Sequence, residues 1–238
     1  MSVELGQHIR LFRPEGAGPF PAIAQFHGCG GLTPLQFDYA QAAVAQGLIV
    51  AVVDSFTPRG IGRVEATATI CTGLRLRGRE RSADIATTLD WLALQPGVDS
   101  ARLGVAGWSH GGWSVMEALA HPNPPERVRN LAFVGLIYPY CGLAASTAKK
   151  GWGARKPPVF ACLAGRDQVV GRRGPLAALA RLEADGIGVE RLEFPDATHA
   201  FDDQFASDPR SQWRPDLACI AHDRYAKAAA RALGSMRR

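Results

Sequence analysis

Ser109 stands between two glycines in the run GVAGWSHGGWSV, directly after an apolar stretch. The pattern Gly-x-Ser-x-Gly is typical of a nucleophile elbow, a tight strand-to-helix turn that exposes a serine hydroxyl. Such a turn needs Gly107 and Gly111, because side chains at these positions would collide with neighbouring chain segments. A chain of this composition contains the pattern by chance about 0.1 times, so other parts of a catalytic site must accompany it before Ser109 counts as a nucleophile.

A second and independent motif, HGCGG at residues 27–31, directly follows the apolar run PAIAQF. A glycine-rich loop after an early strand can direct backbone N–H groups at a carbonyl oxygen on which negative charge develops. The N–H of Cys29 is the natural donor in this loop, and we interpret Cys29 as a backbone donor and not as a thiol nucleophile. The N–H of His110 is the second donor, because it opens a helix whose dipole favours negative charge. The two motifs together predict an oxyanion hole.

A serine hydroxyl is a poor nucleophile until a base removes its proton, so a histidine and a carboxylate are expected farther along the chain. His199, in EFPDATHAFDD, follows the last predicted strand, whereas the other histidines lie in strands, helices or the two motifs. Asp167, in CLAGRDQVV, follows the preceding strand and is the first choice for the carboxylate. Asp196 is the alternative. The order Ser109, Asp167, His199 is the one expected for this kind of elbow.

The segments around these residues predict the sheet that positions them. Several short runs are apolar on successive residues, as in strands buried on both faces of a parallel sheet. Longer amphipathic segments alternate with them, which indicates an α/β fold with a mostly parallel central sheet and helices on both faces, in a single domain over residues 1–238. The expected strands are 8–12, 21–27, 48–54, 103–108, 132–139, 158–165 and 189–195, and the expected helices are 35–47, 82–97 with Ser82 as N-cap, 111–122, 175–186 and 217–234.

Aromatic and basic residues near the predicted strand ends are candidates for a substrate pocket. Trp108 adjoins the elbow and Tyr138 follows a strand end, although large aromatic residues at such places more often belong to the core. Arg59 follows another strand end and is a candidate for facing the site. The arginine-rich run RLRGRERS at 75–82 is better interpreted as a solvated face before a helix than as a guanidinium site for a substrate carboxylate.

The composition, with 47% hydrophobic and 21% charged residues in 238, is that of a folded globular protein. The net charge is +5, but the arginines are scattered, so nucleic acid is not an expected partner. The first residues lack the apolar core of a signal peptide and no apolar run is long enough to span a bilayer, so we expect a cytoplasmic protein without a membrane partner.

Five widely spaced cysteines form neither a disulfide framework nor a zinc site, and no metal is expected. A mature exported form, periplasmic or secreted, is the alternative to the cytoplasm. In that case a bridge between Cys71 and Cys141 is possible.

The segments HGCGGL, VVDSFTPRG, DWLALQPGVDSARLGVAGWSHGG, LAGRDQVV and DATHAF together resemble the dienelactone hydrolase family. The resemblance implies an α/β-hydrolase fold without a large cap domain and a Ser109–Asp167–His199 triad. Dienelactone hydrolases proper carry cysteine as the nucleophile and a glutamate in the loop after the early strand. This chain has Ser109 and no glutamate in HGCGGL, so it is similar to the serine-bearing relatives.

We therefore expect a hydrolase of small-molecule carboxylic esters or lactones that needs no cofactor and is a monomer or homodimer. The alternatives are a non-catalytic binding protein on the same scaffold, a thioesterase and a peptidase.

Overall fold

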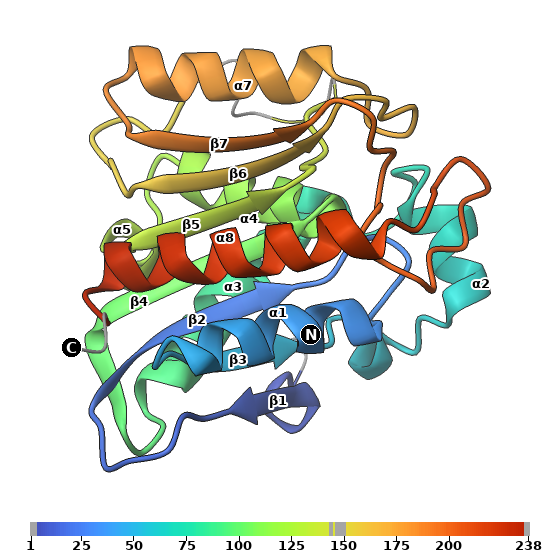
Figure 1. Ribbon diagram of the computed structural model, residues 1–238. Helices are drawn as coiled ribbons and strands as arrows, with labels where there is room; N and C mark the ends of the chain where they lie inside the picture. The colour runs from blue at the N-terminus through green and yellow to red at the C-terminus, as the bar shows by residue number, and fades with distance from the viewer. Residues whose placement is uncertain (1–3, 143–144, 146–150, 236–238) are drawn as a thin grey trace.

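The computed structural model describes residues 4–142, 145 and 151–235, and within them the chain forms a seven-stranded sheet (Figure 1). The strand order is β1-β3-β2-β4-β5-β6-β7, with β1 antiparallel to β3 and every other pair parallel. All seven predicted strands are confirmed. They are β1 (Ile9–Phe12), β2 (Phe20–Phe26), β3 (Ile49–Val53), β4 (Val98–Trp108), β5 (Phe133–Ile137), β6 (Val159–Ala164) and β7 (Val189–Phe194).

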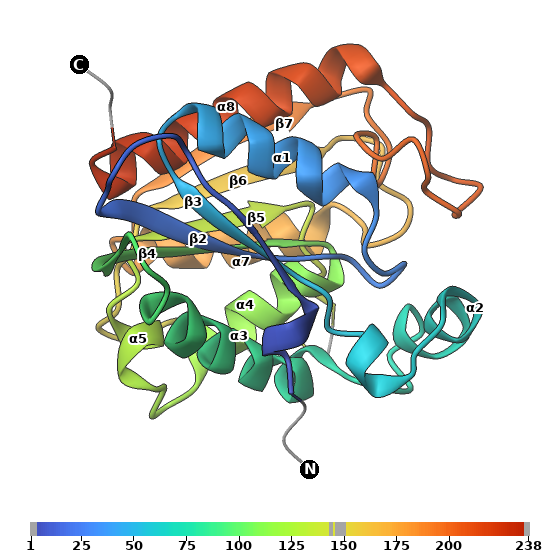
Figure 2. The same ribbon diagram turned by 90° about the horizontal axis from the view of Figure 1, so that it is seen from below.

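Helices cover both faces of the sheet, as predicted (Figure 2). The face covered by α1 and α8 and the face covered by α3, α4 and α7 each enclose a separate apolar cluster. In β3, Ile49 and Val53 enter one cluster and Val50 enters the other, which explains why this strand is apolar on successive residues. The helices are α1 (Pro34–Ala45), α3 (Gly78–Ala93), α4 (His110–Ala120), α5 (Glu126–Arg129), α7 (Arg173–Ala184) and α8 (Pro215–Leu233).

The start of α3 differs from the prediction that Ser82 is its N-cap. The helix begins at Gly78, and the Glu80 carboxylate accepts a hydrogen bond from the Arg77 N–H at 2.9 Å. This contact caps the first turn at Arg77, five residues before the N-cap that the sequence suggested. Ser82 therefore lies inside the helix, where its hydroxyl donates to the carbonyl of Arg79.

The segment between β3 and α3 has its own structure, which the sequence did not predict. It contains a 3₁₀ turn (η2, Thr57–Arg59), a short α2 (Arg63–Glu65) and a π-helical turn (η3, Ala66–Ile70). We call residues 57–77 the lateral segment. Its buried apolar side chains form a small cluster with Phe56, against which Cys29 packs. A disulfide joins Cys29 to Cys71, with Cα atoms 5.1 Å apart.

The suggested bridge between Cys71 and Cys141 is therefore wrong. Cys71 is already paired with Cys29, whereas Cys141 is a free and buried thiol. Burial raises the pKa of the Cys141 thiol to about 12, so this cysteine is an inert apolar side chain at neutral pH.

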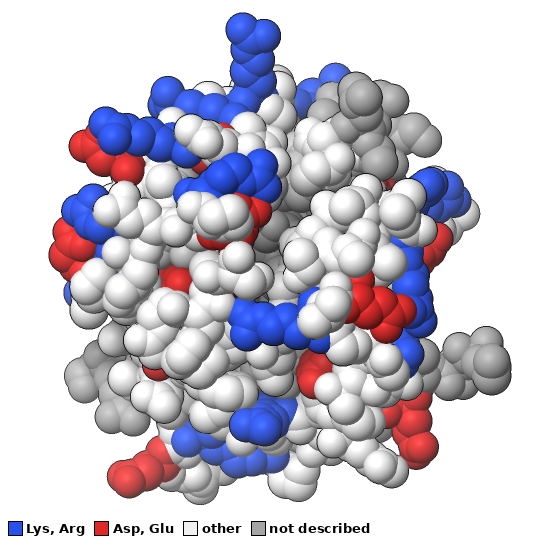
Figure 3. All heavy atoms as spheres, turned by 90° about the vertical axis from the view of Figure 1, so that its right-hand side faces the viewer, with Lys and Arg blue, Asp and Glu red and all other residues white. Residues whose placement is uncertain are grey.

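The carboxyl ends of the parallel strands meet at the edge of the sheet on the right in Figure 1. The lateral segment and the chain between β7 and α8 flank this edge, and the described residues contain no large cap domain above it. Basic and acidic side chains are interspersed over this face of the molecule (Figure 3). No helix in the described part of the chain combines the length and apolarity that crossing a bilayer requires.

Candidate active site

Ser109 occupies the junction between β4 and α4 in a strained backbone conformation, with φ 51° and ψ −111°. A non-glycine residue adopts this region only where the surrounding structure imposes it. A Cβ atom added at Gly107 would overlap the backbone of Gly111, and one added at Gly111 would overlap the carbonyl of Phe26 in β2. The predicted need for both glycines is confirmed, since the turn packs directly on the neighbouring strand.

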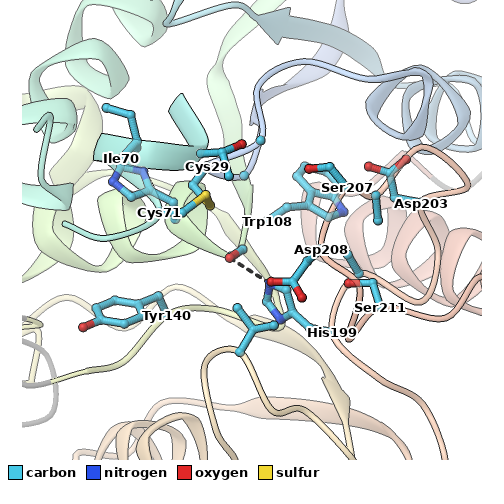
Figure 4. A pocket seen from close by; sticks show the side chains of 18 of the residues that line it. Cys29, Ile70, Cys71, Trp108, Tyr140, His199, Asp203, Ser207, Asp208 and Ser211 are labelled. Carbon is cyan, nitrogen blue, oxygen red and sulfur yellow. Dashed lines mark hydrogen bonds between the residues drawn. A yellow bond between two sulfur atoms is a disulfide. The ribbon is translucent and has the colours of Figure 1, made fainter. Parts of the chain in front are cut away.

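Three side chains from distant parts of the chain meet at this turn. His199 Nε2 lies 3.0 Å from Ser109 Oγ, and His199 Nδ1 lies 2.7 Å from Asp167 Oδ2. One tautomer satisfies both contacts: Nδ1–H donates to the carboxylate, and Nε2 accepts the serine proton. All three residues are buried or nearly so. The dashed line in Figure 4 marks the contact between the serine and the imidazole.

The Asp167 carboxylate is fixed by the turn that follows β6. Its Oδ1 accepts the N–H groups of Val169 and Val170, each at 2.9 Å, which leaves Oδ2 directed at the imidazole. The alternative acid, Asp196, pairs instead with Arg166 at 2.8 Å, and both side chains are more than two-thirds exposed. Of the two predicted candidates, the structure brings only Asp167 to His199.

A tyrosine ring that is held by a buried carboxylate packs against the imidazole. The ring of Tyr138 packs edge-on against His199 with centroids 4.8 Å apart. Its hydroxyl donates to Asp202 at 2.7 Å, and Tyr39 donates to the other oxygen at the same distance. Burial raises the pKa of Asp202 to about 6. This cluster anchors the loop that carries His199, and the spacing of these residues gave no signal of it.

The loop 27–31 lies against the elbow. A Cβ atom added at Gly28 would come within 3.5 Å of the Ser109 Cβ, and Gly28, Cys29, Ser109 and His110 border the same cavity. The N–H of His110 is the first of helix α4, where amide groups have no partner within the helix. The two predicted oxyanion donors are therefore on segments that flank the serine hydroxyl.

The two histidines of these segments are held neutral. Burial, and next the charge of the Arg81 guanidinium, lower the pKa of His110 to about 3 and lower that of His27 as well. His27 Nε2 accepts the N–H of Ser55 at 3.3 Å, and its Nδ1 lies 2.7 Å from the carbonyl of Gly28. These side chains therefore act as fixed hydrogen-bonding groups and do not titrate near neutral pH.

A cavity of about 650 Å³ opens above Ser109. Figure 4 shows Cys29, Ile70 and Cys71 on one side of it and Ser207 and Ser211 on the other. Two of the predicted pocket residues, Trp108 and Tyr138, line this cavity, and both are almost fully buried.

The third candidate for the pocket, Arg59, is not among the residues that line the cavity. Its guanidinium binds both oxygens of Asp84, at 2.7 and 2.9 Å, and the carbonyl of Ser55.

The arginine-rich run contains a residue that sequence reasoning missed. Arg81 is completely buried beneath the elbow, so the prediction of a solvated face is wrong at this position. A signal existed: Arg81, Ile85 and Leu89 are spaced by four and lie on one face of α3, and all three are fully buried.

Comparison with known proteins gives a family and a set of similar folds. The chain matches the dienelactone hydrolase family over residues 8–236, and no curated protein matches it.

Three solved structures illustrate the similar folds. A putative dienelactone hydrolase from Klebsiella pneumoniae is 15% identical, with a TM-score of 0.68 over 93% of this chain and 98% of that one. Esterase 2 from Thermogutta terrifontis with bound propionate is 17% identical, with a TM-score of 0.70 over 97% and 90%. A dienelactone hydrolase-like promiscuous phosphotriesterase from metagenomic libraries is 17% identical, with a TM-score of 0.73 over 95% and 100%. At these identities the similarity establishes the fold, an α/β-hydrolase fold without a large cap.

Proposed function

Since the chain belongs to the dienelactone hydrolase family, we propose that it is a serine hydrolase of small-molecule carboxylic esters or lactones. The observation that carries the proposal is the hydrogen-bonded line from Ser109 through His199 to Asp167 at the base of an open cavity. The solved relatives support ester hydrolysis in general, because one is an esterase crystallised with propionate and another is a phosphotriesterase.

The first half of the reaction is acyl transfer to the serine. Ser109 Oγ attacks the substrate carbonyl while its proton passes to His199 Nε2, which lies 3.0 Å away. Asp167 holds the imidazole in the required tautomer and stabilises the imidazolium that forms. The carbonyl oxygen becomes an oxyanion and accepts hydrogen bonds from the N–H groups of Cys29 and His110. His199 then gives the proton to the leaving alcohol, and an acyl-enzyme remains.

The second half is hydrolysis of the acyl-enzyme. A water molecule gives a proton to His199 and attacks the acyl carbon, and the same N–H groups bind the second oxyanion. Collapse returns the proton to Ser109 and releases the acid. For a lactone, the alcohol and the acid are two ends of one product. Apart from substrate and water, each of these steps uses groups that the residues of this chain supply.

The decisive experiment compares Ser109→Ala with wild type on short p-nitrophenyl esters, lactones and thioesters. We expect kcat to fall by about four to six orders of magnitude. Ser114→Ala is a matched control: Ser114 is a buried serine of α4 that repeats the sequence GWS, and its hydroxyl donates to the carbonyl of His110. It should keep wild-type rates. Full esterase activity in Ser109→Ala would end the proposal.

A fluorophosphonate probe separates the enzyme from a non-catalytic binding protein on the same scaffold. A competent Ser109 is labelled and a silent scaffold is not. Rates on the esters, lactones and thioesters of the panel also show which bond is cleaved fastest. A thioesterase would be recognised by higher rates on thioesters than on esters.

The disulfide bears on where the protein works. Of the two locations that the sequence left open, a bridge between Cys29 and Cys71 favours an oxidising compartment, the periplasm or the exterior, because cytoplasmic thiols are kept reduced. Fractionation of cells that express the natural gene tests this.

A further inference from the structure

Arg81 lies on α3 beneath the elbow and is fully buried. Its Nε donates to Ser55 Oγ at 3.1 Å. Its Nη1 donates to the carbonyl of His27 at 2.8 Å and lies 3.2 Å from His110 Nδ1. A guanidinium can only donate, so Nδ1 of the neutral His110 is the acceptor in this contact. One nitrogen of a single side chain thus contacts two segments that are far apart in the sequence.

These two segments are the ones that carry the oxyanion donors. His27 begins the glycine-rich loop, and Cys29 comes two residues later. His110 supplies the other N–H itself and also opens α4. A shift of either segment would change the angle at which its N–H meets the oxyanion, and hydrogen bonds weaken steeply when they bend. Because Arg81 bonds to both segments, it fixes the position of one donor relative to the other.

The charge of Arg81 is only partly offset by carboxylates, because Asp84 and Asp54 act on it through space and not by direct contact. No carboxylate among the described residues forms an ion pair with it within 4 Å, and Asp84, on the same helix, is engaged by both terminal nitrogens of Arg59. Burial lowers the pKa of Arg81 to about 10, which still leaves it protonated at neutral pH. A buried positive charge attracts an oxyanion more strongly than the neutral carbonyl of bound substrate, so its stabilising effect is larger in the transition state than with substrate bound.

We propose that Arg81 is a positioning residue that holds the two halves of the oxyanion hole together and places a fixed positive charge behind them. This role rests on the proposed serine-hydrolase function and adds to it. A buried arginine that merely supports the fold would affect stability, whereas this role predicts an effect on catalysis.

The test compares Arg81→Gln and Arg81→Lys with a matched control, Arg155→Gln. Arg155 donates to the carbonyls of Leu119 and His121 at the opposite end of α4, at 2.9 and 3.1 Å, and does not border the cavity. For each protein we would measure kcat, KM, the melting temperature and the inhibition constant of an alkylboronic acid. A boronic acid adds to the serine as a tetrahedral anion and so reports on the oxyanion hole, whereas the melting temperature reports on folding.

Arg81→Gln should lower kcat by roughly 100-fold, with KM changed by less than about threefold, as for loss of one oxyanion donor. Its boronate affinity should fall in proportion to kcat/KM. Arg81→Lys keeps the charge but lacks the rigid planar fork and the Nε donor to Ser55, so it should recover about a tenth of the wild-type kcat. Arg155→Gln should lower the melting temperature and leave kcat and boronate affinity at wild-type values.

The role is overturned if either Arg81 variant keeps kcat and boronate affinity within about threefold of wild type while Ser109→Ala is inactive. It is also overturned if Arg155→Gln loses as much kcat as Arg81→Gln. An active Ser109→Ala would instead remove the proposed function itself. If Arg81→Gln does not fold, Arg81→Lys decides by the same two measurements.

Discussion

Removal of the disulfide between Cys29 and Cys71 should lower both the stability and the activity of the protein. Cys29 carries one proposed oxyanion donor, and Cys71 comes directly after the π-helical turn of the lateral segment, which borders the cavity. The bridge therefore fastens a loop of the site to the wall of the pocket. Replacing Cys71 by serine removes the link and leaves the residue that bears the donor unchanged.

The loss of unfolding free energy depends on the length of chain that the bridge closes. The two cysteines are 42 residues apart. Loop-closure entropy for this length predicts a loss of about 4 kcal/mol of unfolding free energy, or roughly 10 °C in melting temperature for a chain of this size. Loss of one oxyanion donor costs about 100-fold or more in kcat, so a donor that is loosened but not lost should cost less than that.

The assay is urea unfolding of wild type and Cys71→Ser, each with and without a reductant, together with kcat on one ester. The unfolding free energy of wild type should fall by about 4 kcal/mol when the reductant is added. Cys71→Ser should have the lower unfolding free energy from the start, and the reductant should not change it. Cys219→Ser is the control, because Cys219 is free and exposed and its loss should change neither quantity. Five reactive thiols in unfolded, unreduced protein, or identical midpoints for wild type and Cys71→Ser, would refute the reasoning.

Three further predictions concern the residues around the serine. Burial raises the pKa of Asp202 from 3.8 to about 6, so the stability that its protonated form contributes is complete well below pH 3.8 and is lost as the pH rises through 6. Asp202→Asn should therefore gain about 2 kcal/mol of unfolding free energy relative to wild type between pH 4 and 7.5 in urea unfolding, and parallel pH curves would contradict this. Gly111→Ala places a methyl group on a backbone carbonyl of β2 and should cost more than about 2 kcal/mol and most of the activity, whereas Gly62→Ala, with open space around it, should cost little. Asp167→Asn should lower kcat by about 10⁴ through the wrong imidazole tautomer while leaving the melting temperature within a few degrees; a rate within tenfold of wild type would show that Asp167 does not orient the imidazole.

The sequence predicted the sheet well because strands buried on both faces leave a strong pattern. Val50 and its neighbours in β3 are apolar without interruption since each faces one of two cores. The residues brought together at the elbow were also predictable, because each directly follows a strand and parallel strands end at one edge. Glycine marked the places where chains touch, as Gly111 does against β2.

The lateral segment escaped prediction because nothing in it has a regular period. Its turns are short, and its buried apolar residues pack on one another and on Cys29, away from the two main cores, whereas Val64 and Leu74 are exposed. A disulfide partner cannot be chosen from spacing alone when the cysteines are scattered. The interpretation of Arg81 was wrong because it relied on the charge of the side chain, which favours exposure to solvent. The spacing of four residues between Arg81 and Ile85 instead indicated a buried face of the helix.

The residues that escaped prediction share a role that explains why local patterns missed them. Ser109 and the two proposed oxyanion donors belong to motifs, and a motif records what a short stretch of backbone must do. Arg81 contacts a carbonyl 54 residues away, and Cys71 bonds to a cysteine 42 residues away. Both act between segments, and both end at the loop 27–31.

That loop has glycine at three of its five positions, so its own backbone is flexible. A donor on such a loop is useful only if other parts of the fold hold it still, because a donor that must reorganise during the reaction stabilises the oxyanion less. The disulfide restrains this loop from the cavity side and the guanidinium from the core side. If this reasoning is right, Cys71→Ser and Arg81→Lys together should lower kcat by more than the product of their separate effects, since each restraint limits the motion that the other loss allows.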